Sequence, residues 1–426
     1  MAPAETTKTT TQIVQPVSVR RRIIMGVIFL AFAALTLLVF LPNTAADLKT
    51  SFGLTPGGLT RGAVANWVVK SQLTMIIIGV VTVLLGIYQL VRGFGKRTNA
   101  ILGLIALMFV FAFLTYAARG KSVNIGGLIS SSLSLAVPII LGAYSGILCE
   151  RSGIINIGIE GMMLMGALVG ALVGSISKSP WIGLLGSIFS GMLLALVLAW
   201  LSIKYKINQI ITGTVINIFG TGMTSFISAK FMQTNEALNN TPMFTRVPIP
   251  LLADIPFIGP ILFNNNLFIY GTILVAIILQ VALFSTRWGL RLRAVGEHPK
   301  AADTLGINVI KTRYMGTLLG GMVAGFAGGY FTLGSVGRFD EMMSAGKGFI
   351  GLAAMIFGNW NPIGAFGAGM LFGFADAFGS KLSILGSVVP PQFMAMLPYI
   401  ITMVVLAGLI GKGHAPAAEG TPYEKE

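Results

Sequence analysis

The chain has 426 residues, of which 54% are hydrophobic and only 10% are charged, and its mean hydropathy is +0.83. Because soluble domains carry about 25% charged residues, this composition excludes an ordinary soluble protein. The net charge of +15 comes from basic residues in short loops between apolar runs, a pattern of membrane topology that does not indicate nucleic-acid binding. One cysteine and two histidines provide neither a metal cluster nor a disulfide framework. The sequence predicts an all-α polytopic membrane protein.

In chain order, residues 1–19 are polar and rich in threonine, which predicts a disordered N-terminus. Apolar runs then predict about twelve transmembrane or re-entrant helices, because a bilayer requires about 20 apolar residues per crossing. They are residues 20–41, 68–91, 98–118, 123–148, 153–176, 181–203, 207–232, 267–285, 314–336, 346–358, 363–379 and 391–410. Segment 346–358 is too short to cross unaided, so we expect it to be re-entrant or broken.

The basic residues set the expected orientation of these helices. With the N-terminus inside, 18 of the 29 Lys and Arg residues fall on the inner side. Both termini, including the tail 411–426, and the polar segment 286–313 are therefore predicted to be cytoplasmic. Segment 233–266, which is rich in Pro and Asn, is predicted to face outward, either as a surface for an external partner or as a plain connecting loop.

The segment 149–165, CERSGIINIGIEGMMLM, places polar residues inside an apolar span. Asn156 and Glu160 are four residues apart and would share one helix face. An ionisable residue in a span indicates a functional site, here a lining of the substrate path. The alternative is that Glu160 caps a broken helix by accepting backbone N–H bonds, since three glycines surround it.

A second polar stripe lies in segment 207–232, where Thr214, Asn217 and Thr221 are spaced three and four residues apart. Such a stripe suits either the lining of a pore or hydrogen bonding between helices. The sequence leaves both roles open.

The polar segment 286–313 contains a predicted short helix whose two ends are both marked. Pro299 suits the first helical position, and Gly306 suits the left-handed residue that closes the last turn. Between them Ala301, Ala302 and Leu305 form a small apolar face. A short amphipathic helix of this kind between membrane spans is typical of a part that docks into another protein.

The chain carries no pattern for chemistry of its own. It contains no phosphate-binding GxxxxGK[ST] loop, no HExxH and no GxSxG, so we expect no ATP hydrolysis, no catalytic residue and no metal site. It is predicted to be a transporter component, not an enzyme.

Two stretches, GILCERSGIINIGIEGMMLMGA (146–167) and WGLRLRAVGEHPKAADTLGINV (288–309), carry a family resemblance. Together and in this order they resemble the permease subunits of type II ABC importers, in the simple-sugar and nucleoside branch related to ribose and branched-chain amino acid permeases. The resemblance covers a permease core of about residues 123–410, and the wording ERSGIINIGIEGMML is most similar to nucleoside importers. Residues 20–122 then add N-terminal transmembrane helices of unknown role.

The resemblance implies that the cytoplasmic helix is a coupling helix that seats in an ATPase subunit. The residues that match are Arg293, Ala294, Gly296, Glu297, Ala301, Ala302, Leu305 and Gly306. It also implies three protein partners: an ABC ATPase that binds ATP and magnesium, a second homologous permease, and an extracytoplasmic substrate-binding lipoprotein. The location would be a bacterial or archaeal inner membrane, surrounded by lipids.

Three functions remain open at this point. The first is a nucleoside importer and the second an importer of ribose-like simple sugars, because the hydroxyls of both cargoes suit Asn and Glu. The third is a secondary transporter coupled to an ion gradient, with Glu160 as the proton-linked site. A docking helix favours the ATP-driven options.

Overall fold

The computed structural model describes residues 19–57, 59, 62–384, 396 and 414–425. Within these ranges ten helices are long and apolar enough to cross a membrane, and one shorter apolar helix is present. The predicted all-α polytopic class is thereby confirmed. Most of the predicted disordered segment 1–19, and most of the predicted last span 391–410, lie outside the described residues.

The chain divides into two compact units, of which the first comprises residues 1–53 and 65–124. Its helices are α1 (Val19–Ala34), α2 (Ser71–Val91) and α3 (Thr98–Ala117). Its three-stranded sheet has the order β2 (Trp67–Lys70), β1 (Lys49–Gly53) and β3 (Ser122–Asn124). Helices α1 and α2 approach closely at Gly26, Gly79 and Gly86, where an added Cβ would meet a leucine of the other helix or of the turn that extends α1.

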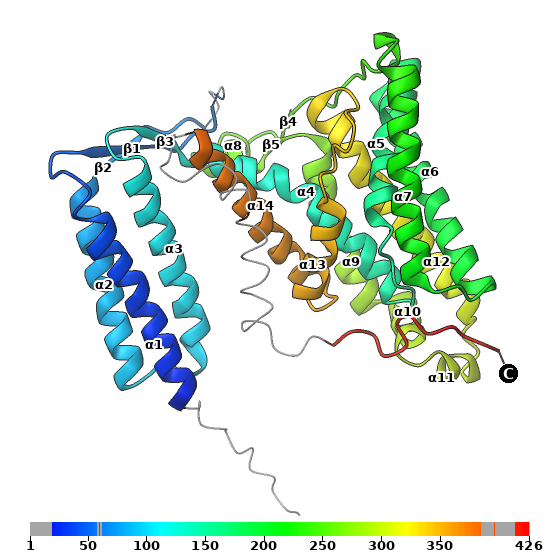
Figure 1. The fold of residues 1–426 in the computed structure, drawn as a ribbon, viewed down its shortest axis with the longest axis horizontal. Helices are drawn as coiled ribbons and strands as arrows, with labels where there is room; N and C mark the ends of the chain where they lie inside the picture. The colour runs from blue at the N-terminus through cyan, green and yellow to red at the C-terminus, as the bar shows by residue number, and fades with distance from the viewer. Residues whose placement is uncertain (1–18, 58, 60–61, 385–395, 397–413, 426) are drawn as a thin grey trace, which may run out of the picture. The chain divides into compact units, whose positions relative to one another are not determined.

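The second unit comprises residues 54–64 and 125–426 and holds the remaining elements (Figure 1). Its long helices are α4 (Ile125–Glu150), α5 (Ile159–Ser177), α6 (Pro180–Ala199), α7 (Gln209–Ile227), α9 (Leu267–Ser285), α12 (Val309–Gly329) and α14 (Pro362–Ile384). Its short elements are α8 (Ile258–Leu262), α10 (Arg287–Glu297), α11 (Pro299–Thr304), α13 (Lys347–Phe357), β4 (Val247–Pro248) and β5 (Asn264–Asn265).

Helix α12 forms the centre of this unit and packs against α4, α5 and α6 through glycines. A Cβ added at Gly191 of α6 would stand only 2.4 Å from the carbonyl oxygen of Gly321, and one added at Gly325 only 2.2 Å from that of Ser187. Small residues therefore allow the backbones to touch, as is typical of membrane helices. The buried apolar side chains of these helices form one continuous core.

Helix α13 is the short segment that the sequence analysis expects to be re-entrant or broken. At 1.5 Å per residue its 11 residues span about 16 Å, roughly half of a bilayer's apolar core of about 30 Å. It is a half-helix, and its backbone polar groups at both ends need partners within the protein.

Two local predictions are corrected by the structure. Helix α5 begins only at Ile159, so Asn156 lies in the irregular segment 151–158 and does not share a helix face with Glu160. The cause is a break at Gly153, whose φ of +90° leaves the helical region. In segment 286–313 the structure forms two helices, α10 and α11, where the sequence predicts one, although Pro299 and the left-handed Gly306 mark the ends of α11 as predicted.

Candidate functional site

The half-helix α13 begins against a single carboxylate, that of Glu160 at the start of α5. Its Oε1 accepts hydrogen bonds from Ser344 Oγ at 2.6 Å and Gly346 N at 2.8 Å, and its Oε2 accepts one from Gly348 N at 2.7 Å. All three partners are donors, which an acceptor-only carboxylate satisfies, and they lie at the positive end of a helix dipole. Since the side chain is buried, this geometry favours the capping alternative for Glu160.

Two further features fix this end of α13. A Cβ added at Gly348 would stand 2.7 Å from both Glu160 N and Glu160 Oε2, so the backbones of α5 and α13 touch there. Lys347, the first residue of α13, forms an ion pair with Asp376 of α14. The N-terminus of the half-helix is therefore held by α5 and α14 together.

Asn217 of α7 holds the irregular segment that precedes α5. Its Oδ1 accepts from Gly161 N at 2.8 Å, and its Nδ2 donates to Ile157 O at 2.9 Å. Gln209, also on α7, accepts from Ile155 N at 2.6 Å. These contacts between elements supply the partners that the broken backbone lacks. Asn217 thus makes hydrogen bonds between helices, and whether it also lines a path stays a prediction.

The other predicted path residues differ in their surroundings. Thr214 is exposed and donates to Ile210 O of its own helix, and Thr221 is half-buried on the same helix. Asn156 is fully buried beside Cys149 Sγ (3.4 Å) and Met162 Sδ, and its Oδ1 has no hydrogen-bond partner. Residues 156, 160 and 217 thus gather at the break before α5, with most of their polar atoms bound to protein.

The predicted coupling residues lie on α10, α11 and the turns that flank them. Thr286 Oγ1 caps α10 by accepting from Gly289 N, and His298 Nδ1 caps α11 by accepting from Ala301 N at 3.3 Å. Ala302 is 2% exposed, whereas Leu305 is 81% exposed, so the predicted single apolar face is wrong: one residue packs inward and the other points outward. An exposed leucine at the end of a short helix is available to a partner.

A groove of about 750 Å³ lies beside this exposed leucine. Its lining combines apolar and basic side chains of α10, of the turn that follows α11 and of the start of α12, among them Trp288, Leu290, Arg291, Leu305 and Lys311.

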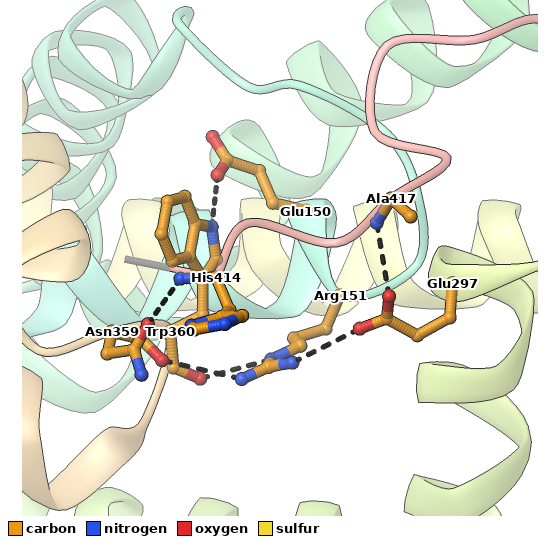
Figure 2. Close-up of polar contacts among 7 residues, drawn as sticks. All are labelled: Glu150, Arg151, Glu297, Asn359, Trp360, His414 and Ala417. Atoms are coloured by element: carbon orange, nitrogen blue, oxygen red, sulfur yellow. Dashed lines mark hydrogen bonds and ion pairs between the residues drawn. The ribbon is translucent and has the colours of Figure 1, made fainter. Parts of the chain in front are cut away.

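Behind α10, a polar cluster joins four parts of the chain (Figure 2). Arg151, just after α4, donates through Nε to Trp360 O at 3.1 Å and lies 3.8 Å from Glu297 Oε1. Trp360 Nε1 donates to Glu150 Oε2 at 2.5 Å. The C-terminal segment enters through His414 N, which donates to Asn359 Oδ1 at 2.8 Å.

Electrostatics and close packing shape this cluster. Burial lowers the pKa of the Arg151 guanidinium, and the carboxylate of Glu297 opposes that shift. Arg293 lies over the ring of Phe284, with 4.8 Å between its guanidinium carbon and the ring centre. A Cβ at Gly296 would stand 2.4 Å from Arg151 O, so only glycine permits this contact of α10 with the α4–α5 loop.

Sequence reasoning assigned no role to Ser344, Gln209, Trp360 or the tail. The signal near Ser344 was the short segment 346–358 that follows it, with glycines at 346 and 348. The first backbone N–H groups of a helix have no partner within the helix and therefore need a capping acceptor. Trp360 and the tail carry no local pattern, because their partners are more than 50 residues distant in the chain.

These features define a class: a polytopic membrane protein with a half-helix inside the bundle and a pair of short helices between two spans. The model for the branched-chain amino acid transport system / permease component family matches residues 128–406, which is more than half of the chain. The chain therefore belongs to this family, whose members are transporter permeases. In the part of the chain that is described, no three His, Cys, Asp or Glu residues could together hold a metal ion.

Several curated relatives match over most of their own length. The chain is 40% identical to the guanosine ABC transporter permease protein NupQ of Bacillus subtilis, covering 70% of this chain and 96% of that one. It is 38% identical to the nucleoside ABC transporter permease protein NupC of Lactococcus lactis, with the same coverage. A putative glucose ABC transporter permease of Haloferax volcanii is 32% identical, covering 66% and 91%. No solved structure matches the chain.

Proposed function

We propose that this chain is the transmembrane permease subunit of an ATP-driven importer and forms part of the path for nucleosides. The observation that carries the proposal is the similarity to guanosine and nucleoside permeases over 96% of their length. The lower identity to the glucose permease makes simple sugars the second candidate cargo.

The ATPase is a separate subunit in this proposal and binds the ATP and magnesium. Its contact is the exposed surface of α10 and α11, with Leu305 as the apolar residue that inserts into it and Arg293, Ala294, Gly296, Glu297, Ala301, Ala302 and Gly306 shaping the helices. The groove beside Leu305 supports this assignment. ATP binding would draw these helices toward those of a second permease and switch the path from outward to inward access.

Two different permease chains are expected in the complex. Of the two Bacillus subtilis guanosine permeases, this chain is 40% identical to NupQ and 25% identical to NupP. Of the two Lactococcus lactis nucleoside permeases, it is 38% identical to NupC and 24% identical to NupB. The sister subunit would complete the path, and an extracytoplasmic binding lipoprotein would deliver the cargo, with 233–266 as a candidate surface for it.

The path itself is proposed to run beside the break before α5. There Glu160 and Asn217 position backbone, Asn156 keeps one unpaired oxygen, and Thr214 and Thr221 extend the polar stripe along α7. The membrane is proposed to be a bacterial or archaeal inner membrane, with both termini and α10–α11 in the cytoplasm. The helices of 20–122 lie before the family match and remain without a proposed role.

The docking proposal is tested by Leu305→Asp. Losing the burial of one leucine in the ATPase contact costs about 1.5–3 kcal/mol, or about 10- to 150-fold in affinity. The matched control is Leu251→Asp, because Leu251 is 85% exposed and lies in the predicted outer segment. In pull-down experiments, Leu305→Asp should fail to capture the ATPase subunit and Leu251→Asp should capture it as wild type does. Equal binding by both variants would overturn the docking proposal.

Cargo and energy source are tested in proteoliposomes that hold the whole complex with its binding lipoprotein. We expect ATP-dependent uptake of guanosine that exceeds uptake of ribose or glucose at the same concentration. An ionophore that collapses ion gradients should leave it unchanged. Uptake that requires the gradient and no ATP would replace this function with an ion-coupled transporter.

A further inference from the structure

The C-terminal residues 414–425 form a strap, with turns at 417–420, across the face that carries α10 and α11 (Figure 1). This strap lies beyond the family match, which ends at residue 406. Ala418 N donates to Gly296 O at 2.9 Å, Gly420 N to Gly153 O at 3.3 Å, and the buried Arg313 donates to Thr421 O at 2.9 Å. The strap therefore binds α10, the α4–α5 loop and α12 at once.

Side chains add to this attachment. Ala418 is buried, and Tyr423 packs against the small apolar cluster of Val295, Ala302 and Val309 beneath α11. At the end of the strap Glu424 forms an ion pair with Lys206. Contacts along the whole segment distinguish the strap from a loose tail.

Glu297, the last residue of α10, divides its carboxylate between two partners (Figure 2). Its Oε1 lies 3.8 Å from Arg151 Nη1, and its Oε2 accepts from Ala417 N of the strap at 3.1 Å. Arg151 and the strap each also form a hydrogen bond with the turn between α13 and α14. Arg151 reaches it through Trp360 O, and the strap reaches it through Asn359.

This turn is the far end of the half-helix α13, whose other end rests on Glu160. Because α13 is short and held at both ends, a displacement of its C-terminal turn would move the helix as a whole against α5. Two connections from one carboxylate to that turn constitute a physical route from the docking helices to the break before α5.

We propose that the strap, with Glu297 and Arg151, is a linkage that passes movement of α10–α11 to the half-helix α13. The proposal rests on the proposed function, since it takes the ATPase as the source of the movement. Glu297 and Ala417 are positioning residues in it, without contact to cargo or nucleotide.

Ala417→Pro tests the linkage with little other disturbance. Glu419 N donates to Pro416 O, so Ala417 occupies the second position of a turn, where proline is favoured, and its φ is not positive. The substitution removes the one N–H that binds Glu297 and keeps the turn. The matched control is Ala417→Ser, which retains that N–H at the same exposed site.

The assay uses the full complex in proteoliposomes, with guanosine as the probe, and measures uptake, ATP hydrolysis and ATPase-subunit binding. For Ala417→Pro we expect binding and basal hydrolysis within twofold of wild type, and guanosine taken up per ATP hydrolysed reduced at least fivefold. Ala417→Ser should behave as wild type. Glu297→Gln, which weakens both connections, should also reduce the guanosine taken up per ATP hydrolysed, but unchanged ATPase binding is required only of the Ala417 variants because Glu297 belongs to the proposed docking helices. A thermal unfolding midpoint unchanged from wild type confirms that each variant is folded.

Uptake per ATP within twofold of wild type in both Ala417→Pro and Glu297→Gln would overturn the linkage. Loss of ATPase binding in the proline variant would also overturn it, because the strap would then be part of the docking surface. Failure of the proposed function is distinct from either result: the wild-type complex itself would show no ATP-dependent uptake of guanosine.

Discussion

Substitution of Glu160 by glutamine separates the two roles that this carboxylate could have. As a cap it holds the start of α13, and as a path residue it would contact cargo. The best orientation of the new amide keeps its oxygen on Ser344 and Gly346 and turns its NH₂ toward Gly348 N, where two donors then face each other. The perturbation is therefore confined to one lost acceptor and one lost charge.

The magnitude follows from these three bonds. Losing the charge-assisted bond to Gly348 N and leaving that buried N–H unpaired costs about 1–3 kcal/mol. Loss of the charge weakens each remaining bond by about 1 kcal/mol, because hydrogen bonds to charged groups contribute about 1.5–3 kcal/mol and neutral ones about 0.5–1.5. The total is about 3–5 kcal/mol. At about 2–4 °C per kcal/mol, the unfolding midpoint should fall by on the order of 10 °C.

This shift in the unfolding midpoint is measured by heating the purified protein in detergent and monitoring the folded fraction by size-exclusion chromatography. Ser344→Ala should lower the midpoint by a smaller amount, since it removes one of the three donors. Glu236→Gln, at an exposed position in the predicted outer segment, is the control and should leave the midpoint unchanged. A Glu160→Gln protein as stable as wild type but inactive in transport would refute the capping argument and return Glu160 to the path.

Two further predictions concern the same contacts and the strap. Gly348→Ala places a Cβ 2.7 Å from the backbone and side chain of Glu160 and should destabilise the protein by about 1–3 kcal/mol. The control Gly367→Ala in α14, where a Cβ meets no atom within 4 Å, should be neutral or slightly stabilising in the same thermal assay. Burial raises the pKa of Glu419, and its hydrogen bond with Glu150 opposes that shift, so docking of the strap is strongest below the ordinary pKa of about 4.5 and weakens as pH rises through the raised value. A spin label at Lys425→Cys, specific because Cys149 is buried, should become more mobile as the pH rises above 4.5. Glu419→Gln should flatten this change, and a mobility independent of pH in the wild type would contradict it.

The sequence was sufficient for the elements whose ends carry local signals. Helix α11 begins at Pro299 and is closed by Gly306 because a fixed φ and a left-handed φ are properties of those residues themselves. Long apolar runs likewise predict spans, since bilayer thickness fixes their length. The half-helix was recognisable for the same reason: 346–358 is too short to cross.

The irregular segment before α5 could not be predicted, because its stability comes from residues far away. Asn156 and Glu160 have helical spacing, but Asn217 and Gln209 supply backbone partners to residues 155–161, and their bonds replace those of a helix. The spacing of residues within the segment predicts only a helix. The observed irregular structure depends on contacts between residues more than 50 positions apart in the chain.

Helix α13 shows how the two ends of one short element connect the separate observations. Its N-terminus is held by Glu160 and by the Lys347–Asp376 pair, and the turn after its C-terminus is held by Arg151 and the strap. A helix of about 16 Å has too few internal hydrogen bonds to keep its position alone, so these contacts determine where it lies. It follows that Glu160→Gln and Ala417→Pro should differ in kind: the first loosens α13 and lowers stability, whereas the second leaves it folded and disconnects it from α10.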